Sequence, residues 1–417
     1  MIRFLHAADL HLDRPFEGLT RLPESLHERA ARSTFIALQR LVDAVLHEKA
    51  DFLIISGDLF DNSHRSIKAQ HAFVKEMRRL YAASIPVYLV YGNHDFVNET
   101  WNQLRLPDNV HVFPETPECF TLTCANGQVV HLYGFSYHQK WVKENMAAHY
   151  RKSGTADFHI ALLHGEEKSG IDDGHYAPFT LSDLETAGFD YWALGHIHKR
   201  QQLPTSVPAW YPGDLQGLSF KDSELGLKGT SVVRLTQHHA EVRFLPTSDI
   251  EWIHADRFFG QIETADQLAE ALRAFKEDER EKHQGVFVRL NSTIEQHGLP
   301  QQTLEKLFRE VIETLNEDEE PLSDFVWLEL GTFDVHGGWN KEEIMNSPHF
   351  AGDLFRLIEQ PKSVEEAAEM LYSHHLGRRF LPPLSSEDQQ QIRHASEQLL
   401  ADVLLNDTQS GSIDNES

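Results

Sequence analysis

Cysteine is nearly absent from this sequence of 417 residues, which contains only Cys119 and Cys124. Two thiols are too few for the disulfide framework that holds many small secreted proteins together. The two residues are five apart on a segment that we expect to be a strand, where this spacing directs side chains to opposite faces. We therefore interpret both cysteines as packing residues.

Long apolar runs are absent as well. No stretch approaches the roughly 18 apolar residues of a membrane-spanning helix, and the residues before His6 lack the apolar run of a signal peptide. We therefore expect a cytoplasmic protein without a membrane anchor. The chain is 41% hydrophobic and 24% charged, which is typical of globular proteins. Its length predicts two or three domains.

Positive charge is scarce, and the formal net charge is -26. Residues 1–250 contain 24 lysines and arginines against 30 acidic residues, whereas residues 251–417 contain 14 against 34. The excess of acid therefore lies mainly in the second part of the chain, and bound divalent cations would neutralise several carboxylates in the first part. Charge by itself gives no positive support for nucleic-acid binding.

The first 200 residues repeat one pattern, in which an apolar run of strand length precedes a polar cluster. Most runs are nearly continuous in apolarity, as expected of strands buried on both faces. Between the first three runs, apolar residues recur at helical spacing over Glu28–Glu48 and Ile67–Ala82. This alternation predicts an α/β sheet with helices packed against it. The runs are Ile2–Ala8, Phe52–Ser56, Val87–Tyr91, His159–Leu163 and Tyr191–Leu194, with later ones near Ser231–Leu235 and Glu241–Leu245.

Each of the first five runs ends in residues that can bind metal ions. Ligand sites in open α/β sheets form beyond the carboxyl ends of the strands. Five strand ends at one edge would therefore bring these side chains to one place. The clusters are Asp9-Leu10-His11, Gly57-Asp58-Leu59-Phe60-Asp61, Gly92-Asn93-His94-Asp95, His164-Gly165 and Gly195-His196-Ile197-His198.

The clusters supply the mixed oxygen and nitrogen ligands that a pair of divalent cations requires. Imidazole suits Mn, Fe, Zn and Ni, whereas shells of oxygen alone suit Mg and Ca. If the strand geometry continues, Asp9 and His11 point the same way. Two cations about 3.5–4 Å apart would clamp a phosphate ester and activate a water molecule. His94 is the natural proton donor to the leaving oxygen, and Asp61 could hold its other ring nitrogen.

These clusters resemble the ordered signature of the calcineurin-like metallophosphoesterase superfamily, D-x-H, G-D-x-x-D, G-N-H-D/E, H and G-H-x-H, all within residues 9–198. The resemblance implies a four-layer sandwich of two mixed sheets flanked by helices. It implies that His94 acts as the acid or transition-state stabiliser, oriented by Asp61. It also implies one metal ion held by Asp9, His11, Asp58 and His198, and a second held by Asp58, Asn93, His164 and His196.

Residues 1–220 are similar in more detail to the SbcD-like and YhaO-type branch of bacterial DNA-repair exonucleases. The similarity lies in H-A-A-D-L-H-L-D, S-G-D-L-F-D, Y-G-N-H-D and Tyr211-Pro212-Gly213. It implies a DNA substrate, two divalent ions that we expect to be Mn²⁺, an SMC-like (SbcC-type) ATPase partner and a homodimer through helices of the catalytic domain. One position departs from the branch, because Asp214 stands where its motif has a small polar residue.

The second part of the chain follows a different pattern. A turn at Pro246–Asp249 leads into a smaller α+β unit, with helices at 265–277 and 302–316, strands at 285–290 and 326–333, and Thr264 as an expected N-cap. Helical patterns follow at 340–346, 351–359, 363–375 and 386–405. We predict a nuclease domain at 1–249, a capping domain at 250–335, a helical partner-docking region at 336–405 and a disordered tail at 406–417.

Three functional hypotheses remain open at this point. The leading one is a metal-dependent DNA exonuclease that acts in DNA repair with an ATPase partner. The second is a phosphomonoesterase or cyclic-nucleotide phosphodiesterase with the same two-metal site, because the reaction at phosphorus is shared. The third is a scaffold subunit with vestigial nuclease activity, which need not hold two ions.

Overall fold

The computed structural model describes residues 1–19, 22–61, 66–96, 104–168, 174–237, 239–260, 262, 264–295, 301–336 and 341–360, with scattered positions from 364 to 400. The helices expected at 363–375 and 386–405 lie largely outside the described residues, and the tail at 406–417 lies wholly outside them. Cys119 and Cys124 are free thiols. Within these ranges no helix is long and apolar enough to cross a membrane.

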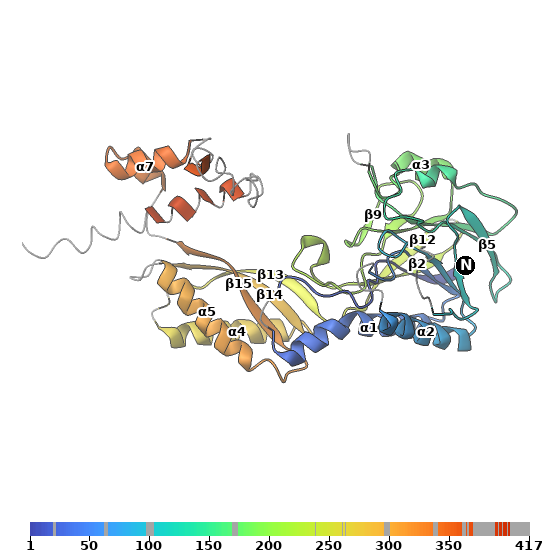
Figure 1. Ribbon diagram of the computed structural model, residues 1–417, viewed down its shortest axis with the longest axis horizontal. Helices are drawn as coiled ribbons and strands as arrows, with labels where there is room; N and C mark the ends of the chain where they lie inside the picture. Colours follow the sequence, from blue (N-terminus) through green and yellow to red (C-terminus); the bar gives the residue numbers. More distant parts are fainter. Residues whose placement is uncertain are drawn as a thin grey trace, which may run out of the picture. The chain divides into compact units, whose positions relative to one another are not determined.

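The first sheet has six strands in the order β12-β11-β1-β2-β3-β4, and Figure 1 labels β2 and β12 of this sheet. The pairs β1–β2, β2–β3 and β3–β4 are parallel, whereas β11 is antiparallel to both β1 and β12. Five of the expected apolar runs, the first three and the two near Ser231–Leu235 and Glu241–Leu245, therefore lie in one mixed sheet. Its strands are β1 (Ile2–Ala7), β2 (Phe52–Ser56), β3 (Val87–Val90), β4 (Val110–Val112), β11 (Gly229–Leu235) and β12 (Ala240–Pro246).

The second sheet also has six strands, in the order β5-β6-β7-β8-β10-β9. Its inner pairs β6–β7, β7–β8 and β8–β10 are parallel, and its outer pairs β5–β6 and β10–β9 are antiparallel. This sheet is mixed too, as expected. Its strands are β5 (Glu118–Thr123), β6 (Val129–Gly134), β7 (Phe158–His164), β8 (Tyr191–Gly195), β9 (Gln201–Gln202) and β10 (Ala209–Tyr211).

Side chains alternate between two faces along each strand, and this alternation produces the layers. On β1, Phe4 packs into a core shared with the second sheet, and the His6 ring reaches Tyr191 and the Leu194 carbonyl oxygen, 3.0–3.1 Å away. Leu5 and Ala7 face the other way, into a core covered by helices. Burying one such apolar side chain stabilises the fold by about 1.5–3 kcal/mol.

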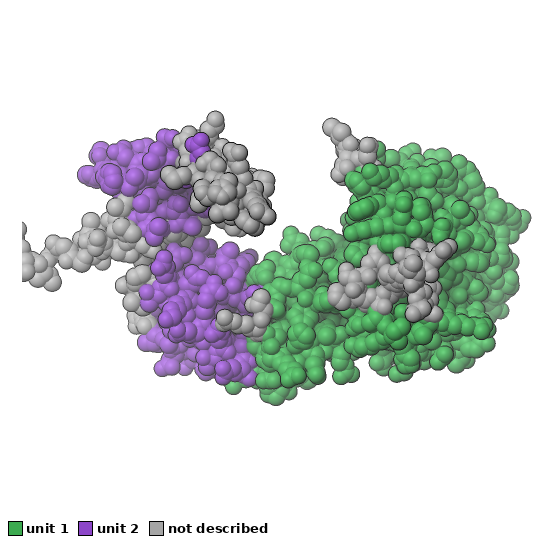
Figure 2. All heavy atoms as spheres, in the orientation of Figure 1, with its two compact units in different colours: residues 1–254, 278–289, 318–327 green, residues 255–277, 290–317, 328–417 purple. Residues whose placement is uncertain are grey.

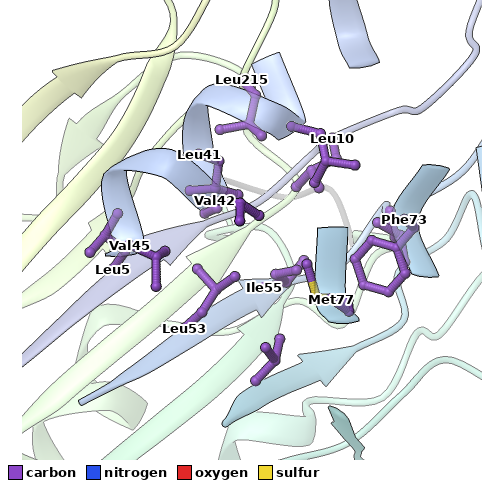
Figure 3. Close-up of a cluster of buried hydrophobic side chains, with 14 of the residues drawn as sticks. Leu5, Leu10, Leu41, Val42, Val45, Leu53, Ile55, Phe73, Met77 and Leu215 are labelled. Atoms are coloured by element: carbon purple, nitrogen blue, oxygen red, sulfur yellow. The ribbon is translucent and has the colours of Figure 1, made fainter. Parts of the chain in front are cut away.

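Helices cover the outer face of each sheet. The helices α1 (Glu24–His47) and α2 (Ile67–Ala82) lie on the first sheet, and Figure 3 shows Val45 of α1 beside Leu5 of β1, with Leu53 of β2 nearby. The second sheet is covered by α3 (Leu181–Ala187) and a short 3-10 helix. These elements form the four-layer α/β sandwich that the metal-site resemblance implied.

The remaining described elements form a smaller α+β group. Strands β13 (Glu251–Phe258), β14 (Val286–Glu295) and β15 (Val326–His336) make a three-stranded sheet, accompanied by α4 (Ala265–Arg280) and α5 (Gln301–Glu317). Thr264 Oγ1 accepts a hydrogen bond from the Gln267 N–H at 3.2 Å, as expected of an N-cap. Strand β13 was not predicted, because His254, Asp256 and Arg257 interrupt its apolar alternation. Two short helices follow, α6 (Lys341–Asn346) and α7 (Phe350–Ile358).

The chain divides into two compact units, coloured separately in Figure 2. Unit 1 contains residues 1–254, 278–289 and 318–327, and therefore both large sheets. Unit 2 contains residues 255–277, 290–317 and 328–417. The domain boundaries expected at 249, 335 and 405 stay predictions.

Candidate metal centre

The predicted ligands follow five strands and lie in unit 1. Strands β1, β2 and β3 of the first sheet lead into Asp9 and His11, Asp58, and Asn93. Strands β7 and β8 of the second sheet lead into the remaining three histidines. The carboxyl ends of parallel strands meet at one edge of a sheet, and here both sheets direct such an edge to one place. The residues contributed by the second sheet are His164, His196 and His198.

The backbone at these residues does not continue the strands. Positive φ angles occur at Asp9 (52°), His11 (42°), Asp58 (49°) and His196 (101°), outside the regions that non-glycine residues normally adopt. The expectation that Asp9 and His11 share a direction through extended geometry is therefore wrong. A tight turn brings them together instead. Such conformations cost about 1–3 kcal/mol each and cluster at functional sites.

One group of ligand atoms comes from Asp9, His11 and His198, which lie within 4.8 Å of one another. The Nε2 atoms of His11 and His198 are 3.1 Å apart. Asp9 also accepts hydrogen bonds from the His196 backbone N–H at 3.1 Å, which ties the loop after β1 to the loop after β8. These contacts join residues that are 187 apart in the sequence.

A second group comes from Asp58, His164 and His196. The Asn93 amide oxygen joins it, 2.9 Å from His164 Nε2 and 3.1 Å from His196 Nδ1. His164 Nδ1 lies 3.0 Å from the Ser56 carbonyl oxygen, to which it can only donate. This hydrogen bond places the proton of a neutral His164 on Nδ1 and leaves the Nε2 lone pair directed at the site.

Asp58 lies between the two groups. Its Oδ2 atom is 3.3 Å from His164 Nε2 in one group and 3.9 Å from His11 Nε2 in the other. Burial alone lowers the pKa of His164, but the charge and hydrogen bond of Asp58 outweigh burial and raise the pKa to about 9. Burial likewise opposes ionisation of Asp58, yet the field of His164 holds the pKa of that carboxyl below its usual range. The ionised Asp58 carboxylate therefore lies within reach of a cation in either group.

Two glycines are required by the close approach of these side chains. A Cβ atom on Gly57, whose φ is +92°, would lie 2.2 Å from His164 Nδ1. A Cβ atom on Gly92 would lie 2.4 Å from Asp58 Oδ1. Any side chain at either position would displace a candidate ligand, so glycine is needed at both.

The donor set fits two divalent cations. Asp9, His11, Asp58, Asn93 and His164 are each at most 3% exposed, and buried polar atoms without compensating partners are costly. Their oxygen and nitrogen atoms converge in two groups, and Asp58 of one group lies 3.9 Å from His11 Nε2 of the other. A pair of cations bound there would satisfy carboxylate, amide and imidazole lone pairs at once.

His94 and Asp61 stand beside this cluster. The His94 backbone N–H donates to Asp58 Oδ1 at 2.8 Å, while the ring Nδ1 of His94 lies 3.6 Å from Asp61 Oδ2. The Asp61 carboxylate beside the ring raises the pKa of His94. The His94 side chain is 35% exposed, whereas the candidate ligands nearby are buried. His94, Asp61 and His11 also bring ligand atoms within 4.8 Å of one another. An accessible imidazole paired with a carboxylate suits proton transfer at the open side of the site.

Asp95 has a role that the sequence did not reveal. It accepts hydrogen bonds from Leu59 N and Gly92 N, at 2.6 and 2.7 Å, and from Phe60 N. Its side chain is fully buried. It therefore ties the loop that carries Asp58 to the loop that carries Asn93. The signal in the sequence was its place as the last residue of the G-N-H-D/E block, which does not show what its side chain contacts.

Replacing Asp95 with alanine should lower the free energy of unfolding by at least about 2 kcal/mol, because buried N–H groups lose a charged acceptor. Chemical denaturation of the metal-free protein measures this change. The exposed Asp108 offers a matched control, since Asp108→Ala should change stability by less than about 0.5 kcal/mol. Equal stability of both variants would show that Asp95 does not hold the two loops together.

Comparison with known proteins agrees with this geometry. The family model of the calcineurin-like phosphoesterases matches residues 2–200. The chain is 36% identical to the uncharacterized metallophosphoesterase YhaO of Bacillus subtilis, over 96% of this chain and 97% of that protein. It is 27% identical to the DNA double-strand break repair protein Mre11 of Methanocaldococcus jannaschii, over 60% of this chain and 66% of that protein.

A further relative is a subunit of the nuclease SbcCD of Staphylococcus saprophyticus, which is 21% identical over 59% of this chain and 69% of that protein. An Mre11 of Methanopyrus kandleri is matched over only 50% of its length. The similarity to YhaO spans nearly the whole chain, whereas that to the two Mre11 proteins and the SbcCD subunit spans about half to two thirds of each relative. The chain therefore belongs to the calcineurin-like metallophosphoesterase family and is a hydrolase.

Proposed function

We propose that this protein is a two-metal phosphodiesterase that degrades DNA from its ends in DNA repair. The observation that carries the proposal is the convergence of seven donor side chains in two groups, with Asp58 close to a histidine of each. The DNA substrate is supported by the similarity to Mre11 and to the SbcCD nuclease subunit. YhaO itself is described only as an uncharacterized metallophosphoesterase.

Seven residues would hold the cations. Asp9, His11 and His198 would bind one, while Asn93, His164 and His196 would bind the other, and Asp58 would contact both. We propose Mn²⁺, because a mixed set of imidazole, carboxylate and amide ligands suits it better than Mg²⁺. When bound, the two ions would supply a binding site for the phosphate ester and a water molecule of lowered pKa, which can lose a proton and act as the nucleophile.

The chain's own residues would protonate the leaving oxygen and exclude bulk water. His94 would donate a proton to the leaving oxygen, at the exposed side of the cluster. Asp61 would orient the His94 ring and keep it protonated, because its carboxylate raises the pKa of that imidazole. The buried ligands would exclude bulk water from the inner side of the site, where electrostatic interactions are strong.

We also propose an SMC-like ATPase partner, bound through residues 336–405. The relative from Staphylococcus saprophyticus is by its name one subunit of a larger nuclease. In the described part of this region, Phe350 and Leu357 of α7 are 68% and 54% exposed, although Phe355 of the same helix is buried. Exposed apolar residues on an amphipathic helix are suited to binding a partner helix. A homodimer and a cytoplasmic location stay predictions.

The decisive test is incubation of the full-length protein with Mn²⁺ and end-labelled linear double-stranded DNA. We expect progressive release of nucleotides or short oligonucleotides, no attack on covalently closed circles, and no release by Asp58→Asn. Parallel reactions contain bis(p-nitrophenyl) phosphate, p-nitrophenyl phosphate and a cyclic nucleotide.

Each alternative has its own outcome in this assay. Hydrolysis of only the monoester or the cyclic nucleotide, even when the ATPase partner is added, would replace the nuclease by a small-molecule phosphoesterase with the same site. Failure to bind two Mn²⁺ ions, with no hydrolysis of any substrate, would favour the vestigial scaffold.

A further inference from the structure

His198 has a buried carboxylate against the ring edge that faces away from the other ligands. Its Nε2 atom lies 3.1 Å from His11 Nε2, on the side of the Asp9 group. Its Nδ1 atom lies 3.4 Å from Oε1 of Glu224. The two ring nitrogens therefore face different groups, and a carboxylate on one side determines which nitrogen carries the proton.

Glu224 is held firmly in this position. Its side chain is only 4% exposed, and its second oxygen accepts a hydrogen bond from the Leu218 N–H at 2.7 Å. With one oxygen fixed by the backbone, the other is directed at His198. A carboxylate in this position accepts the Nδ1 proton and leaves the Nε2 lone pair for a cation.

A buried ion pair fixes the backbone around both residues. The Lys228 ammonium donates to the His198 carbonyl oxygen at 3.0 Å and to the Ser223 carbonyl oxygen, next to Glu224. Its charge is balanced by Asp214, 2.9 Å away and 2% exposed. Asp214, which departs from the motif of the exonuclease branch, is therefore turned inward to Lys228 rather than exposed to substrate phosphates.

We infer that Glu224 is a positioning residue for His198, and thereby for the cation held by Asp9, His11 and His198, with the Asp214–Lys228 pair anchoring both. The inference rests on the two-metal site proposed above and deepens it. Glu224 touches neither His164 nor Asn93 in the described contacts, so its effect is confined to one of the two cations.

The test is titration of metal-stripped, full-length protein with Mn²⁺ by calorimetry, with electron paramagnetic resonance of the bound ions. Glu224→Ala should weaken one Mn²⁺ site by about 10- to 100-fold and leave the other unchanged, as loss of a ligand's hydrogen-bond partner does elsewhere. The signal of the coupled ion pair should then appear only at higher Mn²⁺ concentration than in the wild type.

Two variants provide the comparison. Asp222→Ala changes an exposed carboxylate in the same short turn and should bind both ions like the wild type. His198→Ala defines complete loss of the affected site. If Glu224→Ala does not fold, the nearly isosteric Glu224→Gln takes its place, and its affinity for one ion should fall in the same direction.

The outcomes separate the inference from the function on which it rests. Unchanged affinity for both ions in a folded Glu224 variant, while His198→Ala loses one, would overturn the positioning role even if thermal stability fell. Equal weakening of both sites would overturn it too. A wild-type protein that binds fewer than two Mn²⁺ ions would instead refute the two-metal site itself.

Discussion

Replacing Asp58 with alanine should abolish phosphodiester hydrolysis and weaken the binding of both cations. Asp58 lies close to a histidine of each group, with Oδ2 3.3 Å from His164 Nε2 and 3.9 Å from His11 Nε2. Loss of the Asp58 carboxylate also leaves the backbone N–H of His94 without its acceptor. We expect a fall in turnover well beyond about 100-fold, the upper end for loss of a group that merely supports a ligand.

The variant Asp58→Asn separates the effect of losing the negative charge from the effect of losing the side chain. Asparagine retains an oxygen that can accept from the His94 N–H, so this variant should fold like the wild type. It removes the negative charge, so affinity for both ions should still fall. Calorimetric titration with Mn²⁺ and a steady-state assay measure the two effects, with the exposed Asp108→Ala as the matched control. Full turnover with two bound ions in either Asp58 variant would refute the assignment of the site.

Replacing His94 with alanine should slow the chemical step by about 10²- to 10⁴-fold while both cations stay bound. The loss should depend on the leaving group. DNA releases an alkoxide that needs a proton, whereas bis(p-nitrophenyl) phosphate releases a stable phenolate that does not. We therefore expect a large loss on DNA and a small one on the dye ester, measured in single-turnover reactions at saturating Mn²⁺.

The design includes a positional control and a supporting variant. His71→Ala changes an exposed histidine on α2 and should leave both rates unaltered. Asp61→Ala should reproduce the pattern of His94→Ala at smaller amplitude, because Asp61 acts through the His94 ring. Equal losses on both substrates would assign His94 to substrate binding rather than proton donation. Loss of bound metal would place it among the ligands.

Much of the catalytic unit follows from short-range patterns in the sequence. Strand β2 and helix α2 have the predicted bounds, Phe52–Ser56 and Ile67–Ala82, because the strand is a continuous apolar run and the helix repeats apolar residues at helical spacing. The candidate ligands were identifiable because each directly follows such a strand, and strand ends in an α/β sheet form the ligand site. The metal site could therefore be predicted from a few residues and their order along the chain.

Other features depend on contacts between distant segments. The fully buried Asp95 joins two loops, but nothing in the sequence around it shows which N–H groups it will meet. Glu224 reaches a ring nitrogen of His198 from a separate turn, and Lys228 reaches the carbonyl oxygen of the same residue. No periodicity or motif relates these residues, because their proximity arises only when the loop after β10 folds back over the strand ends.

The sequence by itself determined the alternation of strands and helices, the set of metal-competent side chains and their order. These features are local properties, set by apolar spacing and by the chemistry of individual side chains. Only the tertiary structure decided how the ligands are held: the left-handed backbone at Asp9 and Asp58, the position of the buried Asp58 carboxylate near a histidine of each group, and the ion pair of Asp214 with Lys228. These depend on the packing of two sheets against each other, which brings together atoms that are far apart along the chain.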